Sequence, residues 1–281
     1  MNNIVKLEDL CIQVRRDIIR MVYNANSGHP GGALGCVELL VVLFFKIMNY
    51  TLPLDPKGKN NDMFFLSNGH ICSVLYSVLS RAGFFETKEL NTFRKINSKL
   101  QGHPALKYHL PGIFISTGSL GQGLSVAVGA AQAKKLDNDN SIIYCLTGDG
   151  ELQEGQIWEA LMFINHYKVN SLITIVDYNG RQIDGDVKNV LTLGKLKEKF
   201  EAFGINVIYE PEGNNITSVT NSLKEAISCS KKGLPTAIIL QTEMGKGVDF
   251  MEGSHSWHGK APNEEQFKKA LTQLPETLGD F

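Results

Sequence analysis

The sequence has almost no net charge. Its 28 lysine and arginine residues face 29 aspartate and glutamate residues, which leaves a formal charge of −1. No cluster of basic residues stands out along the chain. A protein that binds nucleic acid by neutralising its phosphates needs such a basic surface. We therefore expect no nucleic-acid partner.

Cysteine is scarce and shows no metal-ligand spacing. The five cysteines are scattered and odd in number, and most lie in apolar stretches. This distribution is typical of reduced core residues in a cytoplasmic protein rather than of a disulfide framework. The cysteines are Cys11, Cys36, Cys72, Cys145 and Cys229.

Long apolar runs are also missing. The most apolar stretch, residues 37–48, contains Glu38 and Lys46 and is far shorter than the roughly 20 residues of a membrane span. The first ten residues, MNNIVKLEDL, have neither a basic region nor an apolar core, so we predict no signal peptide. These features favour a cytoplasmic location without membrane contact.

No repeat, low-complexity segment or Pro/Ser-rich linker divides the 281 residues, of which 43% are hydrophobic. This length and composition suit one globular domain over residues 1–281. We expect its core at about residues 10–245 and a loop with a short helix over residues 246–281.

Apolar residues recur at helical spacing in several segments and form short β-rich runs in others. After the first helix we expect a glycine-rich turn (27–35), and we expect residues 94–118 to form an ordered loop. The predicted helices cover residues 7–24, 37–48, about 70–81, 122–136, 153–167, 195–203 and 216–230. The predicted strands cover residues 63–66, 142–146, 172–176, 205–209 and 236–241.

This alternation predicts an α/β fold of three layers, with a mostly parallel sheet between helices. Within it, residues 142–176 form a strand–helix–strand unit. Gly148-Asp149-Gly150 follows the first strand and Asp177-Tyr178-Asn179 follows the second. Since ligands of such sheets bind at the carboxyl ends of the strands, both turns are placed to meet a ligand.

The residue types in these turns suit a metal ion and a phosphate. The Asp149 carboxylate and the Asn179 amide oxygen are hard ligands of the kind that Mg²⁺ prefers, and Gly150 allows close approach of the backbone to a phosphate. Each turn alone is more often structural, because Gly-Asp-Gly and Asp-Tyr-Asn-Gly are both good turn sequences. Their joint placement on one unit, 30 residues apart, favours a ligand site.

The chain resembles thiamine-diphosphate-dependent enzymes, whose cofactor signature is Gly-Asp-Gly followed about 30 residues later by Asn. Further motifs resemble those of transketolases, in the same order over about residues 10–262. They are Ser27-Gly28-His29-Pro30-Gly31-Gly32, Ser67-Asn68-Gly69-His70, Gly102-His103-Pro104, residues 117–123 (TGSLGQG), residues 148–155 (GDGELQEG) and Trp257-His258-Gly259.

The resemblance implies thiamine diphosphate with Mg²⁺ (or Ca²⁺ or Mn²⁺ in its place) as cofactors. It implies Asp149, Asn179 and the backbone carbonyl of Arg181 as metal ligands. Gly150 would meet the diphosphate through its N–H group. Gly118 and Leu120 would line the pyrimidine side of the cofactor.

The resemblance also assigns four histidines in glycine-flanked turns. His29, His103 and His258 would contact the donor carbonyl and hydroxyls as catalytic groups, and His70 and His258 would lie near the diphosphate and the reaction centre. Imidazoles can donate hydrogen bonds to a developing alkoxide and move protons. A single loop histidine is more often a bystander; four together favour a polar ring around a ligand.

Glu154 and Glu159 lie five residues apart on a predicted helix, where a solvated helix face is the simpler interpretation. In transketolases the matching glutamates lie at the subunit contact and link two cofactor sites. We therefore predict Glu154 and Glu159 as candidate interface residues.

One part of a transketolase is not found here. The glutamate that activates the cofactor lies in a second, pyrimidine-binding domain of full-length transketolases, as do most sugar-phosphate contacts. The resemblance therefore implies the N-terminal subunit of a split transketolase, which needs a C-terminal partner in an α2β2 complex. Such an enzyme transfers a two-carbon ketol unit from a ketose phosphate to an aldose phosphate.

Three positions depart from the family pattern: Ala105 and Phe114 stand where acidic residues are common, and Tyr178 stands where a second Asn is usual. The first two put the donor and acceptor in doubt, so a split enzyme acting on a different donor or acceptor remains the alternative. A non-catalytic cofactor-binding or regulatory module is less favoured, because a merely structural domain has no need of Asp149, Asn179 and the four histidines. A dinucleotide-dependent dehydrogenase is disfavoured because no Gly-x-Gly-x-x-Gly opens a helix after a first strand.

Overall fold

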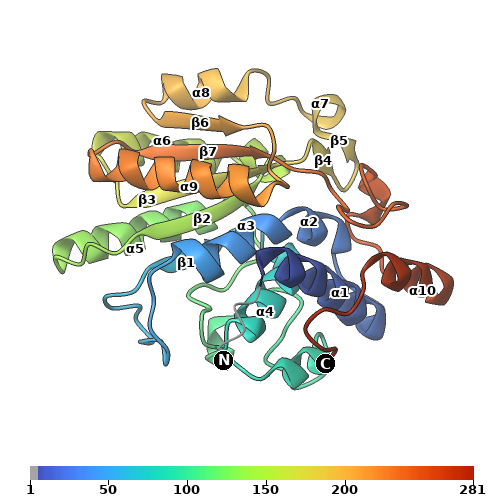
Figure 1. Cartoon of the computed structure of the whole chain (residues 1–281). Coiled ribbons are helices and arrows are strands. Elements are labelled where there is room, and N and C mark those ends of the chain that lie inside the picture. The colour runs from blue at the N-terminus through green and yellow to red at the C-terminus, as the bar shows by residue number, and fades with distance from the viewer. Residues whose placement is uncertain (1–5) are drawn as a thin grey trace.

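A five-stranded parallel sheet forms the centre of the chain (Figure 1). The computed structural model describes residues 6–281. The strands run in the order β1-β2-β3-β7-β6, and every neighbouring pair is parallel. Their bounds are β1 Met63–Leu66, β2 Ile143–Gly148, β3 Leu172–Tyr178, β6 Asn206–Glu210 and β7 Thr236–Gln241. The predicted strands and the predicted parallel sheet are thus confirmed.

The sequence of the central strands explains their position. β2, β3 and β7 are nearly continuous runs of aliphatic and β-branched residues that are buried along almost their whole length. Strands of this kind are covered on both faces by helices. Edge strand β6 is only partly buried, in keeping with its position at the end of the sheet.

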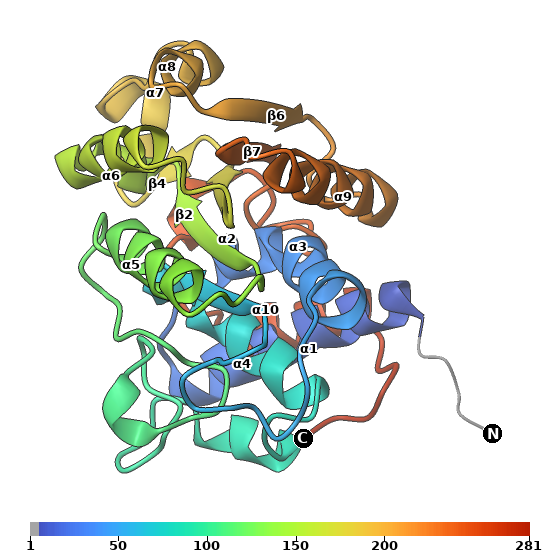
Figure 2. The ribbon, with the colours of Figure 1, turned by 90° about the vertical axis from the view of Figure 1, so that its left-hand side faces the viewer.

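Helices cover both faces of the sheet, which confirms the predicted three layers. Figure 2 shows α5, α6 and α8 on one side of the strands and α3 and α9 on the other. Two hydrophobic cores correspond to these two faces: Phe65 and Cys145 point into one, and Phe64 and Tyr144 into the other. The helices are α5 Gly123–Leu136, α6 Gly155–His166, α8 Leu196–Ala202, α3 Val37–Val42 and α9 Ile216–Lys231.

Further helices pack outside α3 (Figure 1). α10 lies against α1, where the rings of Tyr23 and Phe267 stack with centroids 3.9 Å apart. Asp17 of α1 is fully buried and forms an ion pair of 2.8 Å with Arg81 of α4. These helices are α1 Leu7–Ala25, α2 Pro30–Gly35, α4 Cys72–Arg81 and α10 Glu264–Gln273.

Several details differ from the prediction. The expected glycine-rich turn over residues 27–35 contains helix α2, which begins at Pro30, a residue pre-organised for the first helical position. The expected helix 37–48 changes to a π-helical turn at Leu43–Ile47. A small hairpin (β4 Arg181–Gln182, β5 Gly185–Asp186) and helix α7 (Val187–Val190) were not predicted. They are too short for a hydrophobic period to reveal them.

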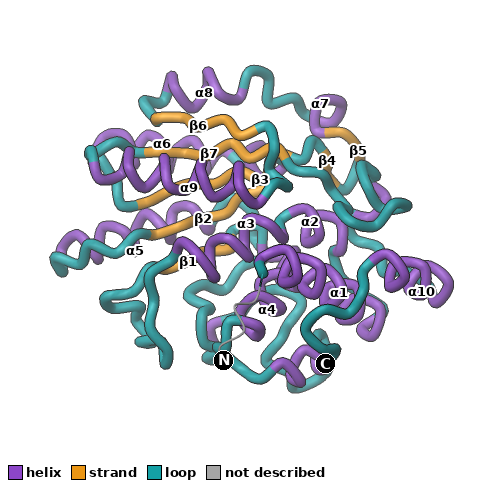
Figure 3. The backbone as a smooth tube through the Cα atoms, in the orientation of Figure 1, coloured by secondary structure: helices purple, strands orange, loops and turns teal. Residues whose placement is uncertain are grey.

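The loops at the carboxyl ends of β2 and β3 meet beside the β4–β5 hairpin (Figure 3). Gly148, the last residue of β2, pairs with Asp177 of β3. The strand register therefore places the two predicted ligand turns next to each other.

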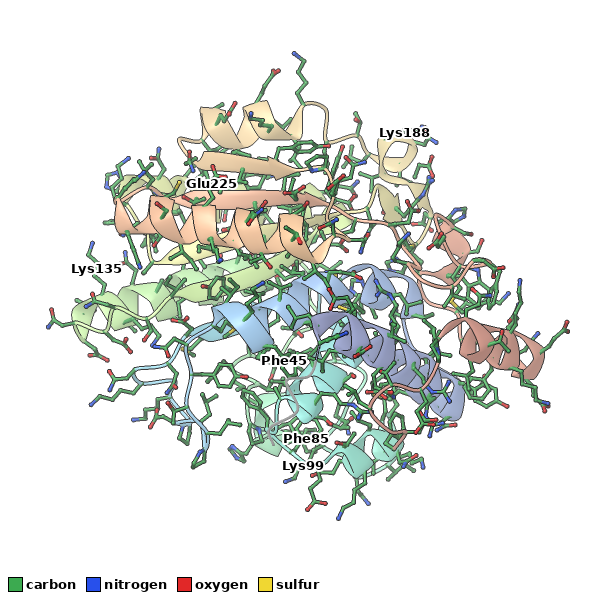
Figure 4. All side chains as sticks on the ribbon, viewed as in Figure 1. Phe45, Phe85, Lys99, Lys135, Lys188 and Glu225 are labelled. Atoms are coloured by element: carbon green, nitrogen blue, oxygen red, sulfur yellow. The ribbon has the colours of Figure 1, made fainter. Side chains whose placement is uncertain are left out.

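Exposed charged side chains, among them Lys135, Lys188 and Glu225, lie around the periphery (Figure 4). All five cysteines are free and four of them are buried, as predicted. Within residues 6–281, no helix combines the length and the apolar character that a membrane crossing requires.

Candidate functional site

A cavity of about 290 Å³ opens at the carboxyl ends of β2 and β3. Ten of the predicted site residues line it, although they come from widely separated segments of the chain. They are His29, His70, His103, Gly118, Leu120, Asp149, Gly150, Asn179, Arg181 and His258. The cavity is therefore where the sequence motifs meet in space.

Glu154 and Glu159 do not line this cavity. Glu154 is the residue before α6, Glu159 lies within it, and both are on the outside of the described chain. Their position leaves them free to contact another chain.

Two buried carboxylates form the floor of the cavity. Asp149 is 1% exposed and Asp177 is 2% exposed. Burial and the negative charge of Asp177 raise the pKa of Asp149 to about 7. Burial also raises the pKa of Asp177, although Thr242 and Asn179 donate hydrogen bonds to it. A divalent cation near these groups would offset both their burial and their mutual repulsion.

The turn after β3 is held against Asp149. The Gly180 N–H donates a hydrogen bond of 2.6 Å to Asp149 Oδ2, and Gly180 has a positive φ of 72°. The Asn179 Nδ2 group donates to Asp177 Oδ2 at 2.8 Å, while Asn179 Oδ1 accepts from the Arg181 N–H at 2.9 Å. These contacts orient the Asn179 amide, whose oxygen keeps a further lone pair for a cation.

The four predicted histidines form one cluster. The ring centroid of His29 lies 5.1 Å from that of His70, 5.6 Å from that of His258 and 6.4 Å from that of His103. His70 and His258 are stacked at 5.0 Å. His29 comes from the residue before α2, His70 from the turn after β1, His103 from the loop after α4, and His258 from the C-terminal segment.

Burial makes these imidazoles weak bases. It lowers the pKa of His29 to about 4 and that of His70 to about 3, with smaller contributions from the neighbouring histidines. It also lowers the pKa of His103 and of His258. The cluster is therefore neutral at pH 7, and each ring presents one N–H donor and one acceptor to a ligand.

Arg94 adds a positive charge beside the cluster. Its Nη1 donates a hydrogen bond of 2.7 Å to Ser27 Oγ, and its Nη2 lies 3.5 Å from His29 Nδ1. Within residues 6–281 it forms no ion pair, whereas each other arginine pairs with a carboxylate. No signal in the sequence pointed to Arg94, because a lone arginine in a loop is usually solvated.

Several buried polar atoms around the cavity have no hydrogen-bond partner within the described chain. They include Asn68 Oδ1 and His258 Nδ1, both on residues that line the cavity, and Thr117 Oγ1 beside Gly69. An unsatisfied buried polar atom is costly. Its occurrence here fits a site that is completed by a polar ligand.

A model of the family "Transketolase, thiamine diphosphate binding domain" matches residues 8–276. This chain belongs to that family.

Relatives and solved structures agree with this assignment. The chain is 38% identical to an apulose-4-phosphate transketolase subunit of Phocaeicola vulgatus, covering 94% of this chain and 92% of that protein. It is 36% identical to the 6-deoxy-6-sulfo-D-fructose transketolase subunit SqwG of Clostridium sp., covering 93% of each. Transketolase from Leishmania mexicana superposes with a TM-score of 0.89 at 29% identity, covering 99% of this chain and 42% of that one. The fold is the thiamine-diphosphate-binding fold of transketolases.

Several residues of this transketolase-family cavity had no role assigned from the sequence. Asp177 and Glu151 were recognised within motifs but were given no function, and Gln182, Ile183 and Met244 were missed. An aspartate at the end of a buried strand, such as Asp177, could have been identified from the sequence as a candidate site residue. A methionine in a C-terminal loop, such as Met244, could not.

The two departures on the loop before α5, Ala105 and Phe114, do not line this cavity. Phe114 is partly buried against Phe65, with ring centroids 6.1 Å apart, and packs on the core on that face of the sheet. Its effect on the choice of donor or acceptor therefore stays a prediction.

Proposed function

We propose that this chain is the N-terminal subunit of a two-component transketolase. With a C-terminal subunit that supplies the pyrimidine-binding domain, it transfers a two-carbon ketol unit from a ketose phosphate to an aldose phosphate. The single observation that carries this proposal is the cavity that joins the Asp149–Asn179 turns to the four histidines. The near full-length match to relatives that are themselves named as transketolase subunits supports a partner.

The donors on the cavity floor fit Mg²⁺ and a diphosphate. We assign Asp149, Asn179 and the Arg181 carbonyl as metal ligands, all of them oxygen donors. Within residues 6–281, no three His, Cys, Asp or Glu side chains are grouped to hold a metal ion by themselves. The ion would therefore need phosphate oxygens as well, as Mg²⁺ commonly does.

The remaining cavity residues would orient the cofactor and substrate. Thiamine diphosphate, when bound, supplies the carbon nucleophile. We assign the Gly150 N–H to the diphosphate, and Gly118 and Leu120 to the pyrimidine side. His70 and His258 would hold the diphosphate end.

Neutral histidines suit the bond-breaking part of the reaction. We propose that His29, His103 and His258 donate hydrogen bonds to the donor carbonyl and hydroxyls and move protons between them. Their depressed pKa values support the hydrogen-bonding part of this role, because an imidazole that stays neutral keeps one N–H donor and one acceptor nitrogen. The nearby Arg94 guanidinium opposes protonation of His29 and His103.

Reconstitution tests the proposal. With thiamine diphosphate and Mg²⁺ present, we expect no turnover of sugar phosphates by this chain alone or by a separately produced pyrimidine-binding subunit alone. The mixture of the two subunits should turn them over. Full turnover by this chain alone would contradict the need for a partner. Failure to bind thiamine diphosphate in the presence of the partner and Mg²⁺ would contradict the function itself.

A different donor or acceptor remains the second candidate. It is favoured by the names of two relatives, which refer to apulose 4-phosphate and to a sulfo-fructose. Turnover by the two reconstituted subunits, measured with a panel of phosphorylated, sulfonated and free sugars, distinguishes the two candidate functions.

We propose that the subunit contact lies on the outer face of α6. Glu159 lies there, one turn from Met162 (55% exposed) and Phe163 (41%), and Glu154 and Tyr167 (51% exposed) flank the helix at its two ends. Exposed apolar groups gathered in this way mark contact surfaces. A second subunit of an α2β2 complex would cover them.

Charge on this face should prevent assembly. We expect Met162→Lys combined with Phe163→Lys to shift the reconstituted complex to smaller species in mass photometry and to lower activity by at least ~100-fold, because two charges would be buried unpaired. Ile96→Lys, at a site 94% exposed, is the matched control and should assemble normally. Assembly of the double variant as in the unmodified protein would refute this location.

A cytoplasmic location is the last part of the proposal. The five free cysteines are in keeping with a reducing compartment.

A further inference from the structure

One buried carboxylate contacts three of the loops that line the cavity. Glu151, in the turn Gly150–Gln153, is 2% exposed. Its Oε1 accepts hydrogen bonds from Ser67 Oγ and from the Gly121 N–H, the latter at 2.8 Å. Its Oε2 accepts from the Gly148 N–H at 3.1 Å. A single side chain thus satisfies donors from three distant parts of the sequence.

Each of these loops carries ligand-facing residues. The loop of Ser67 continues into Asn68 and His70, and the loop of Gly121 follows Gly118 and Leu120. The turn of Gly148 continues into Asp149 and Gly150. All six of these neighbours line the cavity.

The chemistry at this point is specific for a carboxylate. Three donors face Glu151, and both of its oxygens are used. A glutamine has one acceptor oxygen, so its NH₂ group would face either the Gly148 N–H or the Gly121 N–H, donor against donor. A carboxylate buried at this cost is retained only if its hydrogen bonds are needed.

We propose that Glu151 is a positioning residue, which holds the three loops at 66–70, 118–122 and 148–150 in the one arrangement that binds the cofactor. This inference rests on the proposed function for the identity of the ligand. The hydrogen-bond arrangement itself is independent of what the cavity binds. Glu151 acts through the loops and is not assigned a contact with substrate.

The direct test is amide hydrogen exchange of the full chain without cofactor. In Glu151→Gln we expect faster exchange at whichever of the Gly121 and Gly148 amides faces the glutamine NH₂ group, by ~10-fold or more, the effect of losing about 1.4 kcal/mol from a buried hydrogen bond. The Asn49 and Ile142 amides donate to another carboxylate, Asp62, at the opposite end of the strands and serve as internal controls. They should exchange as in the unmodified chain.

Cofactor affinity is the second readout. With Mg²⁺ and the partner subunit, Glu151→Gln should weaken thiamine diphosphate binding at least ~10-fold, because the loops must be ordered again on binding. Asp17→Asn is the matched control. Asp17 is also a fully buried carboxylate bound to three side chains, Gln13, Ser77 and Arg81, but lies on α1 away from the cavity. The Asp17→Asn variant should have a lower melting temperature, and its affinity for thiamine diphosphate should stay within ~2-fold of that of the unmodified chain.

The outcomes separate the two claims. Unchanged exchange at both the Gly121 and the Gly148 amide would overturn the positioning role. Acceleration at either amide in a chain that never binds thiamine diphosphate would support the positioning role and reject the proposed function. If Glu151→Gln does not fold, Ser67→Ala and Glu151→Asp provide the same readouts, and exchange and affinity equal to those of the unmodified chain would overturn the proposal.

Discussion

Asp149→Asn should weaken Mg²⁺-dependent binding of thiamine diphosphate strongly and make the stability of the metal-free chain less dependent on pH. Binding should weaken by at least ~100-fold, because loss of even an outer partner of a metal site costs ~10–100-fold. Turnover of the reconstituted enzyme should fall below detection. The measurement is a thiamine diphosphate titration with and without Mg²⁺.

The weaker pH dependence follows from the raised pKa of Asp149, about 7. A carboxyl group whose pKa is higher in the folded than in the unfolded chain stabilises folding at low pH and loses this contribution as the pH rises from about 4 to about 7. The asparagine carries no charge, so that pH-dependent loss disappears, although its NH₂ group would face the Gly150 or the Gly180 N–H, donor against donor, at every pH. In urea unfolding without metal, we therefore expect the free energy of unfolding to fall less between about pH 4 and about pH 7.5 in Asp149→Asn than in the unmodified chain, by on the order of 2 kcal/mol.

Asp62→Asn is the matched control for this prediction. Burial raises the pKa of Asp62 as well, but this residue precedes β1 at the opposite end of the parallel strands. It should leave cofactor binding unchanged. Normal Mg²⁺-dependent binding by Asp149→Asn would eliminate the metal assignment.

Gly123→Ala and Gly129→Ala should have opposite effects on stability, although both lie in α5. A Cβ atom on Gly123 would clash with Ser67 Oγ and come within 2.7 Å of Ser67 Cα. Strand end and helix must then separate, at a cost of about 1–3 kcal/mol. A Cβ atom on Gly129 meets nothing within 4 Å, so alanine should stabilise the helix by about 0.5–1 kcal/mol.

The same pair should differ in function. Gly123→Ala displaces Ser67, whose hydroxyl donates to Glu151, and should weaken thiamine diphosphate binding ~10-fold or more. Gly129→Ala should bind as the unmodified chain does. Urea unfolding and cofactor titration check both effects. A stable Gly123→Ala variant with full affinity would show that the close approach of α5 to β1 is not needed.

Much of the fold could be predicted because its signals are local. The strands over 172–176 and 236–241 are continuous aliphatic runs, and the structure has them at Leu172–Tyr178 and Thr236–Gln241. Helix α1 follows its hydrophobic period closely. The π-helical turn at Leu43–Ile47 and the β4–β5 hairpin have no such period and depend on packing with distant segments.

The candidate site divides in the same way. By itself the sequence indicated the residues that we propose carry the chemistry, Asp149, Asn179 and the four histidines, because they stand in short contiguous motifs. Only the tertiary structure decided that Glu151 joins three loops, that Asp177 opposes Asp149, and that Phe114 packs against the core. The physical reason is that hydrogen-bond partners, burial and charge coupling are properties of neighbours in space, which the order of residues along the chain does not specify.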